Sequence, residues 1–447
     1  MVSESTAPPP ENVPSDEETA SPEDAASQAD DRGSTWLTRP FVSLTYSSFR
    51  LFWLSNLIVA LGLMVQFTAQ GWLVVQLTDS ALLLGLVEGL FGLSFAAGSI
   101  PMGVIADRFN RRDLLLIDNF IALLAAAAIG TLAITGTIQI WHVVCVSLLG
   151  GLLMSVRFPA SQAMVVRLVP KRHLMNATSL NTASGSLPNI AGPALGGVLI
   201  GVVGIGAAYF VTTGALAVAL VMLMLGVAAS FGHVERREAQ SVTADLREAW
   251  DYLVGHRDLL KLTAAMLTPF IMGQSFVLLL PLFVEQELGG GAATFGALSA
   301  CLGAGGVLGA MLVATFGQQR QIGNLMFLGV LSVGISATVY GFSPWVALTG
   351  GALFAAGAGQ SVLFAAYETY LLIRLPDEMR GRVMGLTFTM VAFFPVSAVL
   401  AGALSDVIGL RAVAMIEGVV IIGMAGLAWW GILRSVVAEG EPAAEAG

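Results

Sequence analysis

Long apolar segments separated by short polar connections recur along nearly the whole chain. An apolar run of about 20 residues is long enough to cross a bilayer as an α-helix. Twelve such segments are expected, at roughly 49–76, 82–106, 113–136, 140–169, 176–204, 207–231, 260–285, 293–316, 321–342, 345–373, 380–405 and 410–434. The pattern predicts an all-α integral membrane protein.

The basic residues test this count, because Lys and Arg concentrate in the cytoplasmic loops of membrane proteins. With twelve spans, all but two of the 21 Lys and Arg residues fall on one side. The exceptions are Arg411, on the opposite side, and Arg157, inside a span. An odd number of spans would scatter this pattern. We therefore expect a multi-pass protein of the cell membrane with both termini in the cytoplasm.

Composition agrees with the bilayer as solvent. The chain is 56% hydrophobic and 11% charged, whereas soluble domains carry about 25% charged residues, and its mean hydropathy is +0.80. Much of the net charge of −9 comes from acidic residues in the first 31 positions. Residues 1–38 are therefore expected to form a disordered acidic cytoplasmic tail.

The spans divide into two halves, 39–231 and 260–434, followed by a short cytoplasmic tail, 435–447. The segment from Val156 to Pro170 resembles the segment from Val362 to Pro376 at an offset of 206 residues. Weak internal symmetry of this kind is typical of secondary transporters. The central loop, 232–259, is predicted to hold an amphipathic helix that places Leu246, Trp250 and Leu253 on one face and rests on the inner leaflet; the alternative is a solvated linker helix.

Several kinds of chemistry are disfavoured. The two cysteines, Cys145 and Cys301, lie in opposite halves, and the four histidines form no cluster. No metal site, cofactor, disulfide or nucleic-acid partner is expected, and no obligate protein partner is evident. No G-x-x-x-x-G-K-[ST] loop is present to bind nucleotide phosphates. No nucleophile–base arrangement points to an enzyme. Energy for transport would come from a gradient or a partner.

The loop after the second span carries a dense basic and acidic motif, made of Gly103, Ala106, Asp107, Arg108, Arg111 and Arg112. It resembles the signature of the major facilitator superfamily. The resemblance implies twelve helices in two pseudo-symmetric six-helix halves, and a conformational latch in which Asp107 faces the start of helix 11, near Arg380. The corresponding loop after helix 8 has Gln318 and Gln319 instead, so the latch is expected in the first half only. The alternative is an ordinary basic loop.

Helix 5 contains Gly192, Pro193, Gly196 and Gly197, which resemble the core of the antiporter motif of exporters in this superfamily. Proline removes a helical hydrogen bond and kinks the helix. Glycines four residues apart let a neighbouring backbone approach closely. The alternative is a packing motif without a transport role. The segments 49–53, 76–80 and 375–383 narrow the resemblance to enterobactin-type siderophore exporters and macrolide efflux proteins.

Ionisable residues inside spans are functional candidates. Glu88, Glu368, Asp118 and Glu417 are candidates for proton coupling, with Glu88 and Glu368 preferred, since Asp118 is expected to pair with the basic loop beside it and Glu417 to lie on an outer scaffold helix. Arg157 is a candidate for binding a substrate anion or for pairing with an acid. Further substrate-binding candidates, on the helices that line the cavity in the family, are Gln66, Gln70, Gln162, Gln274, Tyr367 and Tyr370.

The resemblance implies a proton-coupled exporter that moves a bulky, amphipathic small molecule, such as a drug, macrolide or siderophore, by alternating access. Its partners would be that substrate, protons and the lipid bilayer. An uptake permease or gradient-independent facilitator of the same fold is one alternative. A membrane sensor that transports nothing is another.

Overall fold

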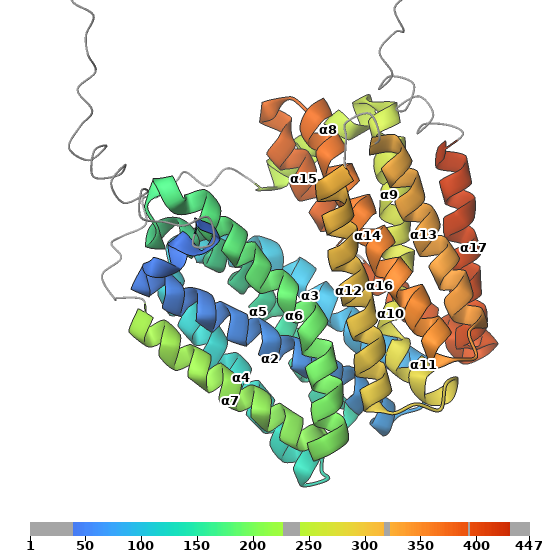
Figure 1. Ribbon diagram of the computed structural model, residues 1–447, viewed down its shortest axis with the longest axis horizontal. Coiled ribbons are helices and arrows are strands. Elements are labelled where there is room, and N and C mark those ends of the chain that lie inside the picture. The colour runs from blue at the N-terminus through green and yellow to red at the C-terminus, as the bar shows by residue number, and fades with distance from the viewer. Residues whose placement is uncertain (1–38, 227–241, 317–321, 392–393, 430–447) are drawn as a thin grey trace, which may run out of the picture. The chain divides into compact units, whose positions relative to one another are not determined.

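The computed structural model describes residues 39–226, 242–316, 322–391 and 394–429. Every regular element in these ranges is helical (Figure 1). This arrangement follows from the apolar runs, because a helix satisfies its backbone hydrogen bonds internally and can therefore be surrounded by lipid. The helices from α2 to α17 belong to one compact unit, Ser43–Gly447.

The first set of helices is called the N-terminal bundle here. It follows a short 3-10 helix, η1 (Arg39–Thr45). Its members are α2 (Ser47–Leu77), α3 (Ala81–Arg108), α4 (Arg111–Ile134), α5 (Ile140–Leu168), η2 (Lys171–His173), α6 (Leu174–Val203) and α7 (Ile205–Gly226). Polar side chains define several starts: Ser80 accepts a hydrogen bond from Leu83 N at the start of α3, and Asn110 accepts one from Arg112 N at the start of α4.

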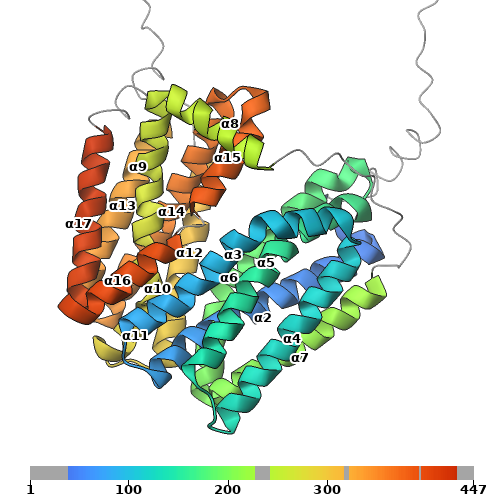
Figure 2. The ribbon, with the colours of Figure 1, turned by 180° about the vertical axis from the view of Figure 1, so that it is seen from behind.

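The second set, the C-terminal bundle, follows α8 (Val242–Gly255). Its members are α9 (Arg257–Gly273), α10 (Ser275–Leu278), α11 (Leu280–Gln286), α12 (Ala292–Phe316), α13 (Ile322–Phe342), α14 (Val346–Arg374), α15 (Asp377–Val391), α16 (Phe394–Ile408) and α17 (Leu410–Ala428). Figure 2 shows the same helices from behind.

The span count is close to the predicted one. Among the described residues, ten helices are long and apolar enough to cross a membrane, and the pair Leu259–Leu278 and Leu280–Gln286, bent by 43°, makes an eleventh if it is one span. The remaining expected span, 380–405, coincides with α15 and α16, which lie on either side of residues 392–393. The all-helical, multi-pass fold is confirmed, and the count of twelve stays a prediction.

The outward-facing surface is apolar, as expected for contact with lipid. Large side chains such as Val202, Leu225 and Val407 are 75 to 80% exposed. Soluble monomers rarely expose broad apolar patches. Inside, one apolar cluster contains residues of both bundles, and Trp72 of α2 stacks on Phe295 of α12 with ring centroids 6.3 Å apart.

Helix α8 lies beside α15, and both views show this pairing. Ala249 and Leu253 of α8 are fully buried in an apolar cluster of the C-terminal bundle, and Arg382 donates to Glu248 at 2.7 Å. Trp250 remains 43% exposed. The packing face therefore contains Ala249 and Leu253 and leaves Trp250 outside, because the small Ala249 lets the helix come close. The side chain of Leu246 lies outside the described residues.

Candidate functional site

Basic residues lie in the α3–α4, α5–α6 and α14–α15 connections, and we call the end of the helices with these connections the basic end. The two bundles meet at the opposite end. At the opposite end, α3 packs against α16 with almost no space between the backbones. A Cβ atom on Gly85 would overlap the carbonyl of Ala398, and one on Gly402 would overlap the carbonyl of Ala81. Only glycine fits at these two positions without moving a helix.

Helices α6 and α12 form a second close contact between the bundles. A Cβ atom on Gly197 would lie 2.6 Å from the carbonyl oxygen of Ala292 and 2.7 Å from Cα of Gly296. In turn, a Cβ atom on Gly296 would lie 2.5 Å from the carbonyl oxygen of Pro193. The predicted glycine motif therefore supplies backbone contact between the bundles.

The other two glycines of the motif face the neighbouring helix of their own bundle. Gly192 lies against the side chain of Met64, and a Cβ atom on Gly196 would lie 2.9 Å from Cβ of Thr68. Both contacted residues belong to α2. One face of α6 thus packs on α2, while Gly197 packs on α12, as expected for closely approaching helices.

The predicted latch falls only partly within the described side chains. Gly103, Asp107 and Arg108 lie in the last turns of α3, and their side-chain environment is outside the described part. Arg112 donates to the carbonyl of Met224 at 3.4 Å and lies 3.6 Å from Asp113, and Arg111 also has an interaction partner. Asn110, which replaces the usual glycine of the signature, caps α4. The latch stays a prediction.

Glu88 lies inside the N-terminal bundle and is 4% exposed. The side chain of Gln70, from α2, lies beside its carboxyl group as a hydrogen-bonding neighbour, and the buried Tyr209 of α7 is close to it. No salt bridge to Glu88 occurs among the described residues. The sequence placed Gln70 and Glu88 in different candidate groups, and the structure brings them together.

Arg157 and Asp118 form an ion pair between α5 and α4. Arg157 also donates from Nη2 to Oδ1 of Asn119 at 2.9 Å. Asp118 is 2% exposed, so its charge is balanced inside the protein. The expectation that Asp118 pairs with the basic loop was wrong, because the side chain points to the neighbouring helix. Of the two readings of Arg157, the structure favours pairing with an acid in this conformation.

Glu417, on α17, is 6% exposed and therefore not at the interface with water. Ser275 lies beside its carboxyl group but donates its hydroxyl proton to Ser397 Oγ at 3.0 Å, and Oε2 of Glu417 has no hydrogen-bond partner in the described part of the chain. The hydroxyl of Tyr340 also has no hydrogen-bond partner in the described part of the chain. Its ring stacks on that of Phe283, with the ring centroids 4.1 Å apart.

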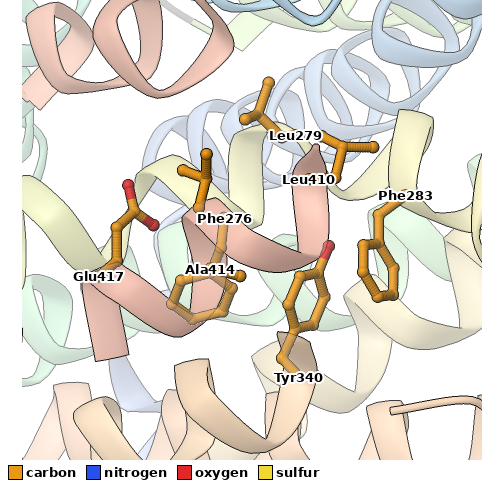
Figure 3. A pocket seen from close by; sticks show the side chains of 8 residues that line it. Phe276, Leu279, Phe283, Tyr340, Leu410, Ala414 and Glu417 are labelled. Carbon is orange, nitrogen blue, oxygen red and sulfur yellow. The ribbon is translucent and has the colours of Figure 1, made fainter. Parts of the chain in front are cut away.

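Figure 3 shows the small cavity beside Glu417 and Tyr340. Its volume is about 10 Å³, and its lining consists of Phe276, Leu279, Phe283, Tyr340, Leu410, Val413, Ala414 and Glu417. A cavity of this size holds about one water molecule. Drug-sized ligands need several hundred Å³. The cavity is therefore suited to a water molecule or a proton and not to a transported compound.

The remaining candidates lie in different surroundings. Tyr367 is 5% exposed and donates to Thr263 Oγ1 at 3.0 Å, so its hydroxyl is engaged within the C-terminal bundle. Tyr370 lies under the guanidinium of Arg374, 5.8 Å from the ring centroid. Gln274 occupies the junction between α9 and α10. Glu368 is half-buried, and no ion pair between the described residues includes it.

A polar chain joins three helices of the N-terminal bundle. Asn181 of α6 donates to Gln162 Oε1 of α5 at 2.9 Å, and Asn56 of α2 donates to Ser161 Oγ at 2.9 Å and to Asn181 Oδ1 at 3.4 Å. Gln66 lies nearly three turns further along α2, by the 3.6 residues per turn of an α-helix, and keeps a buried Oε1 without a partner among the described residues. Sequence reasoning found Gln66 and Gln162 but missed Asn56, Ser161 and Asn181, although amides inside apolar helices were the available signal.

Comparison with known proteins identifies the family. The family model for transmembrane secretion effectors of the major facilitator superfamily matches residues 38–438. The chain belongs to this family. As a member, it is a transporter and not an enzyme, and the resemblance inferred from the basic loop is confirmed.

Named relatives of this transporter share about a quarter of its residues. The multidrug efflux pump Tap of Mycolicibacterium fortuitum is 25% identical over 78% of this chain and 87% of its own length. The enterobactin exporter EntS of Citrobacter koseri is 25% identical over 90% of this chain and 96% of its own. Macrolide efflux protein A of Streptococcus pyogenes is 22% identical over 78% of this chain and 87% of its own.

Solved structures agree on the fold of the transporter. A bacterial homologue of the human lysosomal transporter Spinster superposes with a TM-score of 0.68 at 15% identity. The match covers 92% of this chain and all of that one. Within the ranges that the structure describes, no group of three or more His, Cys, Asp or Glu residues is arranged to hold a metal ion.

Proposed function

We propose that this transporter is a proton-coupled exporter of a bulky, amphipathic small molecule, such as a drug, macrolide or siderophore, and that it works by alternating access. The basic end would face the cytoplasm, following the positive-inside rule. The relatives include a multidrug efflux pump, a macrolide efflux protein and an enterobactin exporter, and this supports export. The bundles contact each other at the end opposite the basic one, which would face the outside. These contacts support a conformation that is closed to the outside.

Glu88 is the observation that carries proton coupling. Its carboxyl group is buried without a paired cation in the described residues, and a charge in such a place is costly. Its partner, Gln70, suits both protonation states: an amide NH₂ can donate to the carboxylate, and the amide oxygen can accept from the protonated acid. The site can therefore gain and lose a proton without leaving a polar group unpaired.

Glu417 would serve as a second proton site in the C-terminal bundle. It follows the first residue of α17, Leu410, by seven positions, as Glu88 follows the first residue of α3, Ala81. At the rise of an α-helix, both lie about 10 Å from the start of their helix. Glu368 remains a further candidate. Asp118 is the weakest of the four, because Arg157 already balances its charge.

The substrate would contact the polar chain formed by Asn56, Ser161, Asn181 and Gln162. These side chains offer donors and acceptors among apolar helices, which is the composition of sites that bind drug-sized molecules. Arg157 would bind a substrate anion only after exchanging its bond to Asp118, so its role in this state is to hold α4 against α5.

The experiment uses the purified transporter in proteoliposomes with an imposed proton gradient and a pH-sensitive dye inside. Lipophilic cations, macrolides and catecholate siderophores are added one at a time. We expect a compound that dissipates the gradient with wild-type protein and fails to do so with Glu88→Gln. Glu285→Gln, which changes an exposed glutamate on α11, is the matched control and should behave as wild type.

Three outcomes contradict the proposal. Substrate-induced proton flux that persists in Glu88→Gln would remove that residue from coupling. Equilibration of a labelled compound without any proton flux would indicate a facilitator, and accumulation in the direction opposite to export would indicate an uptake permease.

A further inference from the structure

Asp406, in the last turn of α16, reaches across to the first turn of α3 in the other bundle. One carboxylate oxygen, Oδ2, accepts from Ser80 Oγ at 2.7 Å and from Leu82 N at 3.2 Å, and the other, Oδ1, accepts from Ala81 N at 2.8 Å. These residues are more than 320 positions apart in the chain. The carboxylate thus binds the start of a helix that belongs to the opposite bundle.

The first turn of α3 depends on this carboxylate for its hydrogen bonds. The first N–H groups of a helix have no partner within the helix. Leu83 N donates to Ser80 Oγ at 3.3 Å, and Leu84 N donates to Ser80 O at 3.2 Å, so these two are satisfied locally. The N–H groups of Ala81 and Leu82 donate to Asp406. Two of these four N–H groups are therefore bonded within the N-terminal bundle, and the other two are bonded by the C-terminal bundle.

Electrostatics favours the same contact. The start of a helix carries a partial positive charge, which a carboxylate stabilises. No salt bridge between the described residues includes Asp406, and its carboxylate is bonded to the helix start. Gly402, one helical turn before Asp406, touches the carbonyl of Ala81. This backbone contact sets the register that brings the carboxylate to the N–H groups.

We propose that Asp406 is a conformational latch that holds the two bundles together at the end opposite the basic one. When the bundles separate at this end, Ala81 N and Leu82 N lose their acceptor and the carboxylate loses the helix start. The latch therefore stabilises only the joined state. It differs from the predicted latch at Asp107, which lies at the other end of α3, and it depends neither on the substrate nor on proton coupling.

The test measures the equilibrium between joined and separated bundles in the absence of substrate. Spin labels are placed at Thr137 and Trp345, which lie in connections of opposite bundles at this end, in a background with Cys145→Ala and Cys301→Ala. Double electron–electron resonance then gives the population of each distance. Asp406→Asn should raise the ratio of separated to joined molecules by about 2- to 30-fold, the range for a charge at a helix start.

Two further variants make the result specific. Asp79→Asn removes the same charge from an exposed residue next to the cap. Because Asp79 repels Glu285 of the other bundle, this substitution should not raise the ratio of separated to joined molecules. Ser80→Ala removes one donor to Asp406 and should shift the ratio in the same direction as Asp406→Asn. An Asp406→Asn distance distribution identical to wild type, in protein with unchanged melting temperature, would overturn the proposal, as would an equal shift in Asp79→Asn.

Discussion

A single methyl group at position 197 tests whether the glycine contact between α6 and α12 holds the bundles together. In Gly197→Ala, the new Cβ would lie 2.6 Å from the oxygen of Ala292, 2.7 Å from Cα of Gly296 and 3.0 Å from its nitrogen. Favourable non-bonded contacts are about 3.5 to 4.0 Å. All three atoms belong to the backbone, so no side chain can rotate away and the helices themselves must separate by several tenths of an ångström.

The size of the effect follows from where the strain acts. Inserting a methylene into a tightly packed site costs about 1 to 3 kcal/mol. In Gly197→Ala this cost falls only on the state in which α6 and α12 touch. The gain in helix propensity, about 1 kcal/mol for glycine to alanine, is the same in both states and cancels from their ratio. The ratio of separated to joined molecules should therefore rise by about 5- to 150-fold.

The matched control is one turn further along the same helix. A Cβ atom on Gly201 would meet only Cβ of Ala293, at 3.8 Å, which is an ordinary contact. Gly201→Ala should leave the ratio as in wild type. The labels at Thr137 and Trp345 report the populations, and a transport assay in the same liposomes should show slower turnover for Gly197→Ala alone. Equal populations in Gly197→Ala and Gly201→Ala would refute the reasoning.

Other substitutions probe buried charge and buried hydroxyl groups. Arg157→Leu should lower the free energy of unfolding by about 3 to 5 kcal/mol, because it leaves Asp118 buried and unpaired. Adding Asp118→Asn should restore most of the lost stability, as measured by thermal melting. A double variant as unstable as the single one would contradict the pairing. Tyr340→Phe should leave the melting temperature unchanged or raise it, because the hydroxyl that it removes has no hydrogen-bond partner in the described residues. A clear decrease of the melting temperature would show that the hydroxyl is bonded. Arg411→Lys should lower the melting temperature of the transporter. Arg411 donates to Glu287 Oε2 at 2.5 Å and to two backbone carbonyls, and lysine cannot reproduce this forked geometry. An unchanged melting temperature would argue against a stabilising role of Arg411.

The helices were predictable because the hydrophobic pattern alone requires them. The expected span at 82–106 is α3 (Ala81–Arg108), and the one at 140–169 is α5 (Ile140–Leu168). The break that separates α10 from α11 was not predicted. Pro281, at the start of α11, was the available signal, because proline donates no backbone hydrogen bond and fits the first turn of a helix.

The interaction partners of the polar side chains within spans were harder to predict than the positions of these residues in the sequence. The sequence identified Asp118, Arg157, Glu88 and Gln70 as polar residues within spans, and all four are buried or half-buried. It assigned Asp118 to the adjacent loop, because proximity along the chain was the only guide. Which faces of two helices meet depends on packing among all of them, and a single sequence does not contain that information in readable form.

Asp406 illustrates both the limit and a usable signal. A carboxylate near the C-terminal end of a helix faces the negative end of that helix's own dipole, which is unfavourable. Asp406 stands two residues before the end of α16 at Ile408. A residue that breaks a local preference is expected to satisfy a contact elsewhere. Here that contact is the start of α3, where the carboxylate accepts two backbone N–H groups. The acid at the unfavourable end of α16 therefore lies where α3 begins, between the two bundles of this transporter.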